Sequence, residues 1–296
     1  MAISTGKVTI ENGETIFFRK RDGGGRVMVL IHGNMSSSQH WESFMSKFPP
    51  EFTLYAVDLR GCGDSSYNRP IETLRDFTED LVMFAREMNL TAITPVGWST
   101  GGGVAMLMAA LYPGLVEKLI LVESVSYKGY PIYRKNMNGE PLVGEYYGSK
   151  EEMAADPIQV APVVEAYQSG NPDLLKYLWN EMIYVVNKPD PEEFEKNIAA
   201  TMKQRNLVDL DWALASFNIS SSFNGVSEGS GLVEKIDCPV LAFWGEKDIV
   251  VTREMAENTV EAIGENARLV ILENSGHSPF TDKPDRILEE IAAFMG

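Results

Sequence analysis

A serine between glycines is the feature of this sequence with the clearest chemical potential. Residues 97–101 have the sequence Gly-Trp-Ser-Thr-Gly, which fits the pattern Gly-x-Ser-x-Gly, and two more glycines follow. The pattern comes after the β-prone run 92–96 and before the apolar run 104–111. Between a strand and a helix it predicts a sharp turn that strains the serine backbone and exposes the hydroxyl, with glycines where side chains would collide. We therefore predict that Ser99 is a nucleophile.

A serine hydroxyl needs a neighbouring base to attack at neutral pH. The chain has three histidines. His277 follows the last predicted strand, so its loop opens at the carboxyl edge of the sheet, where Ser99 is also presented. We assign His277 as the general base. His32 follows an early strand and is expected to shape its loop, while His40 is expected to pack beside Trp41 in a predicted helix or to lie at the surface.

The base in turn needs a carboxylate that orients it. Asp248 directly follows the penultimate predicted strand, and the order Ser99, Asp248, His277 is one of the orders in which such a triad occurs. Glu123 directly follows another predicted strand and is the rival acid. Its alternative roles are a structural hydrogen bond to a neighbouring loop or a position lining the site. Glu246, close to Asp248, is expected to be solvated.

Acyl transfer also needs hydrogen-bond donors aimed at the developing oxyanion. One predicted donor is the backbone N–H of Thr100, directly after the nucleophile. The other is the N–H of Asn34, in the loop after the first core strand, with Met35 as the alternative. The predicted reaction is ester hydrolysis through an acyl-enzyme, for which we expect neither a metal nor an organic cofactor.

Predicted strands and helices, which must position these residues, alternate along most of the chain. Helical patterns separate the apolar runs, and a hairpin around Asn12-Gly13 precedes them. The runs of strand length are 27–31, 54–57, 92–96, 118–122, 240–244 and 268–272. Strands buried on both faces and alternating with helices predict a mostly parallel α/β sheet flanked by helices.

The alternation stops between residues 124 and 232. This stretch has several helical patterns, few clean strands and many aromatic residues. The simplest arrangement is a mainly helical cap, 124–232, inserted into an α/β core that consists of residues 1–123 and 233–296.

Composition limits the partners of the protein. Of the 296 residues, 26 are Lys or Arg and 42 are Asp or Glu, so the net charge is −16. Such a surface repels phosphate backbones, which excludes nucleic acid as an expected partner and disfavours anionic membranes. The sequence shows no membrane span and no secretory signal at its start, so we expect a cytoplasmic protein. Cys62 and Cys238 fit neither a disulfide framework nor a zinc site.

Together the motifs resemble the α/β-hydrolase family over essentially the whole chain. They are His-Gly at 32–33, Asp-Leu-Arg-Gly-Cys-Gly-Asp-Ser at 58–65, the serine turn at 97–101, Trp-Gly-x-x-Asp at 244–248 and Gly-His at 276–277. The resemblance implies an α/β-hydrolase fold with a variable cap that lies over the nucleophile and shapes its pocket.

Residues 97–103, Gly-Trp-Ser-Thr-Gly-Gly-Gly, also resemble the intracellular poly(3-hydroxybutyrate) depolymerases of bacilli. This narrower resemblance implies a neutral ester substrate at the surface of storage polyester granules and 3-hydroxybutyrate as the main product. The alternatives are a small-molecule carboxylesterase, a lactonase or a carbon–carbon bond hydrolase of the same fold, and, from another class, a binding protein with little turnover. Dehalogenases and epoxide hydrolases are disfavoured, because they use aspartate where this chain has Ser99.

Overall fold

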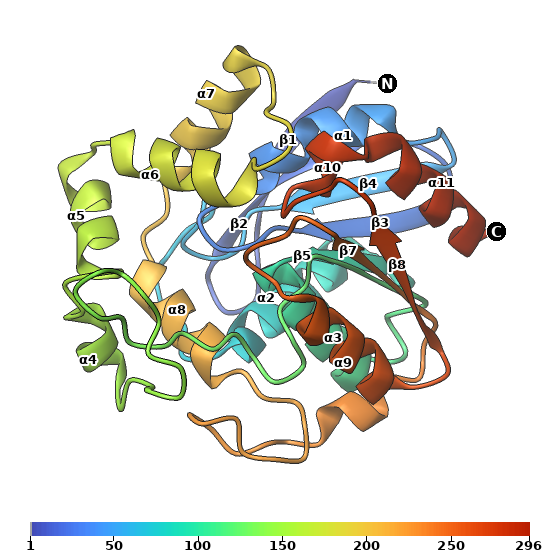
Figure 1. Ribbon diagram of the computed structural model, residues 1–296. Helices are drawn as coiled ribbons and strands as arrows, with labels where there is room; N and C mark the ends of the chain where they lie inside the picture. Colours follow the sequence, from blue (N-terminus) through green and yellow to red (C-terminus); the bar gives the residue numbers. More distant parts are fainter. Residues whose placement is uncertain (1) are drawn as a thin grey trace.

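The predicted strands form one eight-stranded sheet in the structure, a computed structural model that describes residues 2–296. The order across the sheet is β1-β2-β4-β3-β5-β6-β7-β8 (Figure 1). The strands are β1 (Ile3–Thr9), β2 (Thr15–Arg21), β3 (Arg26–Ile31), β4 (Phe52–Val57), β5 (Thr94–Trp98), β6 (Leu119–Val122), β7 (Val240–Gly245) and β8 (Ala267–Leu272). From β4 to β8 in this order all neighbours are parallel, whereas β2 is antiparallel to both β1 and β4. The predicted mostly parallel α/β sheet is therefore confirmed.

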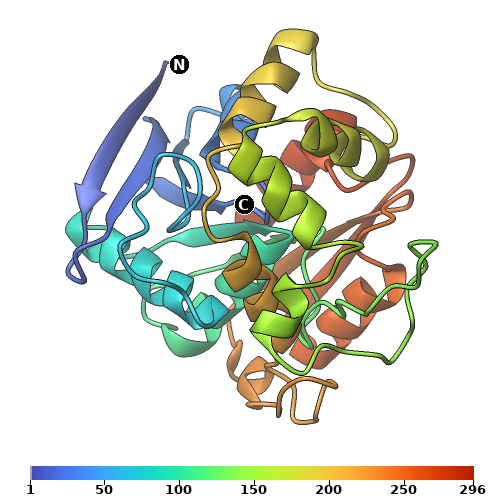
Figure 2. The same ribbon diagram turned by 90° about the vertical axis from the view of Figure 1, so that its left-hand side faces the viewer.

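Helices cover both faces of the sheet (Figures 1 and 2). Helices α2, α3 and α9 pack on one face, and α1, α10 and α11 pack on the other. Their bounds, with the short 3₁₀-helix η1, are η1 (Ser38–Trp41), α1 (Glu42–Lys47), α2 (Leu74–Glu87), α3 (Thr100–Leu111), α9 (Arg253–Ile263), α10 (Pro279–Asp282) and α11 (Pro284–Met295).

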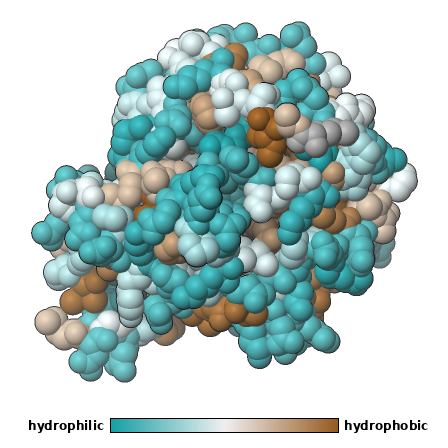
Figure 3. Space-filling model, turned by 90° about the horizontal axis from the view of Figure 1, so that it is seen from above, coloured by the Kyte–Doolittle hydropathy of each residue, from teal (hydrophilic) through white to brown (hydrophobic). Residues whose placement is uncertain are grey.

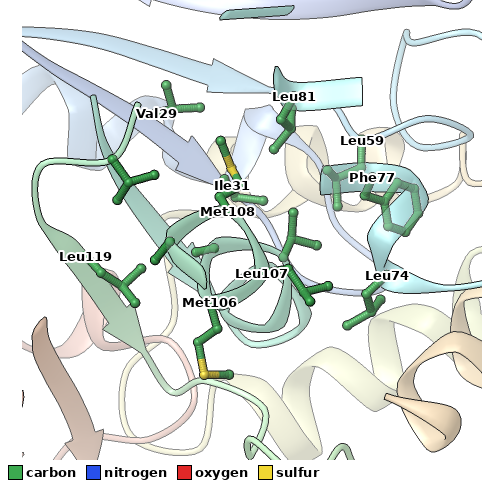
Figure 4. Packing of buried hydrophobic residues seen from close by; sticks show 14 of the residues in the cluster. Val29, Ile31, Leu59, Leu74, Phe77, Leu81, Met106, Leu107, Met108 and Leu119 are labelled. Atoms are coloured by element: carbon green, nitrogen blue, oxygen red, sulfur yellow. The ribbon is translucent and has the colours of Figure 1, made fainter. Parts of the chain in front are cut away.

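The apolar runs of the sequence are long because the central strands are covered on both sides. In β3, Val29 and Ile31 join the buried cluster under α2 and α3, while the alternate residues Met28 and Leu30 join the cluster under α1 and α11. Figure 4 shows the first of these clusters, in which side chains of β3 meet those of α2 and α3. Complete burial of one such side chain contributes about 1.5–3 kcal/mol. The carboxyl ends of β3 and β5 are thereby held firmly in the core.

Helix α3 is buried along nearly its whole length. Every residue from Thr100 to Ala110 is buried, which agrees with a sequence that is apolar on all sides. This helix follows β5 directly, with one residue, Ser99, between them. The position of Ser99 is therefore set by a buried strand on one side and a buried helix on the other.

Between β6 and β7 the regular elements are helices, which include fewer than half of the residues 123–239. The elements are α4 (Lys150–Ala154), α5 (Ala161–Ser169), α6 (Asp173–Leu178), the π-helix η2 (Trp179–Ile183), α7 (Pro191–Thr201), α8 (Leu207–Ser216) and the 3₁₀-helix η3 (Leu232–Lys235). Helices α4 to α8 lie together at one side of the sheet, on the left in Figure 1, and face the viewer in Figure 2. Within residues 2–296, no helix combines the length and the apolar character that a membrane crossing would require.

Candidate active site

Ser99 occupies a strained turn between β5 and α3. Its backbone has φ 54° and ψ −119°, a conformation that residues other than glycine rarely adopt. Three backbone hydrogen bonds hold it. Ser99 N donates to Val122 O at 3.0 Å, and Ser99 O accepts from Gly102 N at 2.9 Å and from Val125 N at 3.0 Å. The Ser99 residue remains partly exposed although its neighbours on both sides are buried. A strained serine presented at a helix N-terminus has the geometry expected of a nucleophile.

The loop after β3 lies against this turn, and a glycine permits the approach. A Cβ atom on Gly33 would lie 2.8 Å from Cβ of Ser99 and 3.3 Å from its Oγ. His32 holds the loop in place, since its Nε2 accepts a hydrogen bond from Leu59 N at 2.9 Å and its Nδ1 lies 2.7 Å from Gly33 O. His32 is completely buried and takes no part in the contacts of Ser99 described above. Its place agrees with the expectation that His32 shapes the loop.

The two residues that are predicted to bind the oxyanion are in contact. Asn34 N donates to Oγ1 of Thr100 at 3.2 Å, which joins the loop after β3 to the residue that follows Ser99. Thr100 is the first residue of α3, and its N–H has no partner within the helix. The N–H of Met35, the alternative donor, is already bonded to Asn34 Oδ1 at 2.8 Å and to Gln204 Oε1 at 2.9 Å. Both amides therefore have partners in this conformation, Asn34 N on the residue after Ser99 and Met35 N on the helical segment, and the choice of Asn34 stays a prediction.

The loops after β7 and β8 bring Asp248 and His277 together. Nδ1 of His277 lies 2.8 Å from Oδ2 of Asp248, and both side chains are buried. The other carboxylate oxygen, Oδ1, accepts hydrogen bonds from Val250 N at 2.7 Å and Val251 N at 3.0 Å. Burial by itself would raise the pKa of Asp248, but the adjacent imidazole and these hydrogen bonds hold it below its ordinary value. Asp248 is thus an ionised, fixed partner for the imidazole.

Trp98 connects this pair to the serine turn. Its Nε1 donates to the backbone carbonyl of His277 at 2.8 Å, and the centroids of the indole and imidazole rings lie 5.9 Å apart. Because Trp98 is bonded directly to Ser99 along the chain, the bond brings the His277 loop to the nucleophile. In this conformation of residues 2–296 the Ser99 hydroxyl and the imidazole are not hydrogen-bonded to each other. Such bonds often tighten only when substrate is present.

The remaining candidates from the sequence lie elsewhere. His40 is buried and stacked on Trp179 with ring centroids 4.7 Å apart, and burial lowers the pKa of His40 to about 3. It is therefore a neutral packing residue, as expected. Glu246 is exposed, also as expected. Glu123 lies beside Asp248 and accepts a hydrogen bond from Gly245 N at 3.0 Å, whereas the Nδ1 atom of the imidazole is bonded to Asp248.

Sequence reasoning did not identify three polar residues of the helical segment that hold the loop after β3. Oδ1 of Asp211 accepts a hydrogen bond from Nδ2 of Asn34 at 2.7 Å. Gln204 bonds both to Met35 N and, through Nε2, to Asn34 Oδ1 at 2.8 Å. Thr201 donates to Met35 O at 2.8 Å. Polar residues on amphipathic helices are common, so nothing in the sequence distinguishes these three.

Asp211 is the acidic group of the helical segment that contacts this loop. Burial raises the pKa of Asp211 to about 7, although the hydrogen bond from Asn34 opposes the rise. The Asp211 residue is partly accessible. As for metals, the part of the chain that the structure describes has no group of three or more His, Cys, Asp or Glu side chains suited to hold an ion.

Comparison with known proteins identifies the family of the chain. The sequence model of the alpha/beta hydrolase fold family matches residues 26–284. The chain belongs to this family. The match includes β3 to β8 and all the candidate residues of the site, from the loop after β3 to the loop after β8.

Two individual relatives share about a quarter of their residues with this chain over most of its length. An uncharacterised protein of Mycobacterium tuberculosis is 28% identical over 276 residues, which cover 92% of this chain and 76% of that protein. A pimeloyl-[acyl-carrier protein] methyl ester esterase of Pectobacterium carotovorum is 26% identical over 95% of this chain and 98% of its own. Among solved structures, an esterase from Exiguobacterium antarcticum superposes with a TM-score of 0.73 at 22% identity, covering 97% of this chain and 98% of that one. This structural likeness establishes the fold.

Proposed function

We propose that the protein is a serine ester hydrolase in which Ser99 is the nucleophile, His277 the general base and Asp248 the orienting acid. The observation that carries the proposal is the 2.8 Å hydrogen bond between the buried side chains of His277 and Asp248, tied through Trp98 to the strand that ends at the strained Ser99. The family and the esterase names of several relatives support the same chemistry.

In the proposed reaction, Nε2 of His277 takes the hydroxyl proton as Ser99 attacks the ester carbonyl. Asp248 stabilises the resulting imidazolium. The backbone amides of Asn34 and Thr100 bind the oxyanion of the tetrahedral intermediate. The alkoxide then leaves with the proton from His277, and a water molecule, deprotonated by the same imidazole, releases the acid and restores Ser99.

We further propose that residues 124–232 are a cap over this site, with residues 1–123 and 233–296 as the core. The support for the cap is its set of contacts with the oxyanion loop, made by Thr201, Gln204 and Asp211. A cover that touches the oxyanion loop would define the space available to the substrate. The identity of the substrate then depends on the cap more than on the residues that do the chemistry.

For the substrate we propose neutral esters, with the esters of poly(3-hydroxybutyrate) first, because the sequence around Ser99 resembles the depolymerases of that polymer. A neutral polyester is compatible with a chain of net charge −16. Figure 3 shows apolar residues as separate patches in a mostly hydrophilic surface, and large apolar side chains of the cap such as Tyr177, Met182 and Val186 are exposed. These side chains offer apolar contacts to a polymer.

The catalytic part of the proposal is tested with a fluorophosphonate probe and the variant Ser99→Ala. We expect the probe to label Ser99 in the wild type and not to label the variant. Turnover of a p-nitrophenyl ester should fall by about 10⁴-fold or more in the variant while its melting temperature is retained. Full turnover by a folded S99A protein would refute the nucleophile, and an unlabelled wild type would favour a binding protein of this fold.

The substrate is tested by product analysis. The enzyme is incubated with amorphous poly(3-hydroxybutyrate) granules and, separately, with p-nitrophenyl esters of increasing length, a lactone panel and vinylogous diketones. Release of 3-hydroxybutyrate that is lost in S99A supports the polyester proposal. Cleavage of soluble esters or lactones alone would contradict it and leave the ester hydrolase standing, while cleavage of diketones alone would indicate a carbon–carbon bond hydrolase.

A further inference from the structure

The carboxyl group of Glu123 occupies an unusual position for an acidic residue. It is completely buried, at 0% exposure, directly after β6 at the carboxyl edge of the sheet. Its backbone has φ 43°, in the left-handed region that residues other than glycine rarely adopt. Two hydrogen bonds attach it to β7, from Glu123 N to Phe243 O at 3.1 Å and from Gly245 N to Oε2 at 3.0 Å. The side chain thus holds the end of β7, from which the turn to Asp248 begins.

The second oxygen of this carboxyl group has no conventional partner. Oε1 of Glu123 is fully buried, and no donor reaches it among residues 2–296. The group that lies within hydrogen-bonding contact is the carboxyl of Asp248. Two ionised carboxylates are both acceptors only, so they cannot bond to each other and repel strongly in a buried place. A single proton between them removes the repulsion and satisfies the unpartnered oxygen.

The structure also indicates which of the two acids keeps the proton. Asp248 accepts three hydrogen bonds, from Nδ1 of His277 and from the backbone amides of Val250 and Val251. Three donors stabilise the charged form of a carboxylate. Glu123 accepts one, from Gly245 N. The charge therefore belongs on Asp248 and the proton on Glu123.

We propose that Glu123 is a positioning residue that is neutral at pH 7, and that its carboxyl O–H donates a hydrogen bond to the Asp248 carboxylate while its carbonyl oxygen accepts from Gly245 N. The proposal rests on the proposed function, since it assumes that Asp248 orients His277. Through this bond Glu123 would fix the plane of the Asp248 carboxylate and so the direction of the imidazole. Glu123 does not touch the reacting atoms.

The charged and titratable groups around Glu123 agree with a neutral acid. They are Asp248 and its partner His277 from the loops after β7 and β8, Asp282 from α10, and Tyr130 from the segment after β6, which faces Asp248. Burial raises the pKa of Glu123 well above its ordinary value, and the negative charges of Asp248 and Asp282 raise it further. The hydrogen bond from Gly245 opposes the rise. Because the two acids share one proton, they titrate as a pair.

Two substitutions at this position separate a hydrogen-bond donor from a charge. Glu123→Gln keeps a neutral donor toward Asp248 and an acceptor for Gly245 N, whereas Glu123→Leu keeps a similar volume and has neither. We expect kcat to fall by about 10- to 100-fold in E123L with KM nearly unchanged, and by less than about tenfold in E123Q.

Glu246→Gln, an exposed acid two residues from Asp248, is the control and should leave kcat unchanged. Equal and severe loss in folded E123L and E123Q would show that a charged Glu123 is required, and full activity in E123L would show that Glu123 positions nothing. Either result overturns the proposal.

A spectroscopic measurement covers the case in which E123L does not fold. In protein with ¹³C-labelled glutamate carboxyl groups, the infrared difference spectrum of wild type minus E123Q at pH 7 should contain the C=O stretch of a protonated carboxylic acid. The band should persist in S99A, because it does not depend on turnover. A carboxylate signal in its place would refute the neutral acid. If S99A keeps full turnover while the band is present, the proposed function fails although Glu123 is neutral. The failure of the proposed function can therefore be distinguished from the failure of this inference.

Discussion

The loops at the carboxyl edge of the sheet and the helical segment above them are built in different ways. All residues of β5 are buried, as is α3 up to Ala110, so the serine turn is fixed from both sides by apolar packing. In the helical segment, α5 has two buried residues and α6 has one. This segment reaches the loop after β3 through polar side chains, chiefly Gln204 and Asp211, and through a small apolar cluster on which Met35 packs.

The difference indicates a division of labour. Apolar packing is insensitive to direction and strong in sum, so the candidate catalytic residues keep their places when the surface changes. Individual hydrogen bonds contribute about 0.5–1.5 kcal/mol each, so α5 and α6 can change in sequence with less effect than α8, which packs into the core through Leu210, Ala213 and Leu214. Substitutions at the sheet edge should therefore alter turnover far more than substitutions of the polar contacts that the helical segment makes with the loop after β3.

The largest effect is expected from Asp248→Asn. An amide cannot stabilise the imidazolium, and it favours the wrong tautomer of His277, so kcat should fall by about 10⁴-fold. The measurement is kcat for a p-nitrophenyl ester, with circular dichroism to show that the fold is intact. A folded D248N protein with more than a tenth of the wild-type turnover would show that Asp248 is not the orienting acid.

A smaller loss is expected when the oxyanion loop is pushed away. A Cβ atom on Gly33 would lie 2.8 Å from Cβ of Ser99, so Gly33→Ala should displace the Asn34 amide and lower kcat by about 10²–10³-fold. Gly114→Ala is the matched control, because a Cβ there meets nothing within 4 Å. If both variants turned over substrate like the wild type, the loop after β3 would not supply an oxyanion donor.

The polar contacts of the helical segment should contribute less. Gln204→Leu removes the hydrogen bonds to Met35 N and Asn34 Oδ1, and we expect kcat/KM to fall by about tenfold or less. The control is Gln159→Leu. This change removes hydrogen bonds to Tyr133 O and the Tyr147 hydroxyl, which join two parts of the same helical segment. A loss in Q204L as large as that in G33A would mean that the helical segment takes part in the chemistry, which would abolish the distinction between the two regions.

The smallest effect concerns stability and its dependence on pH. Burial raises the pKa of Asp211 to about 7, above its value in the unfolded chain of about 4. Between these two values the folded state binds more protons than the unfolded state, so this group makes the protein less stable as the pH rises from about 4 to about 7. Asp211→Asn keeps the acceptor for Asn34 and removes the titration. In urea unfolding at pH 5 and pH 7.5, the variant should gain stability relative to the wild type at the higher pH, and an unchanged difference would refute the raised pKa.

The sequence predicted the core well because burial on both faces produces long apolar runs. The pattern Val-Met-Val-Leu-Ile at 27–31 has no polar alternation, and β3 does supply side chains to both clusters. The end of β5 was less well predicted. The apolar run ends at residue 96, but the strand extends to Trp98, because Gly97 pairs with Ile31 and Leu121 and Trp98 pairs with Val122.

Contacts between distant segments left no comparable signal. Asp211 and Gln204 meet the loop at Asn34 across about 170 residues of sequence, and no local pattern of polar residues announces such a meeting. Glu123 and Asp248 were recognised as rival acids from their places after strands. That one could assist the other follows only from the side-by-side position of β6 and β7 and from the burial of both carboxyl groups.

Three indoles from different parts of the chain gather near the serine turn. Trp41 and Trp179 each lie with ring centroids 6.2 Å from that of Trp98, and Trp179 belongs to the helical segment while the other two belong to the core. Chromophores at this separation couple their electronic transitions, so the protein should have an intense near-ultraviolet circular dichroism signal. Any lifting of the helices during turnover would change that signal, which allows the movement to be followed in real time without an attached dye.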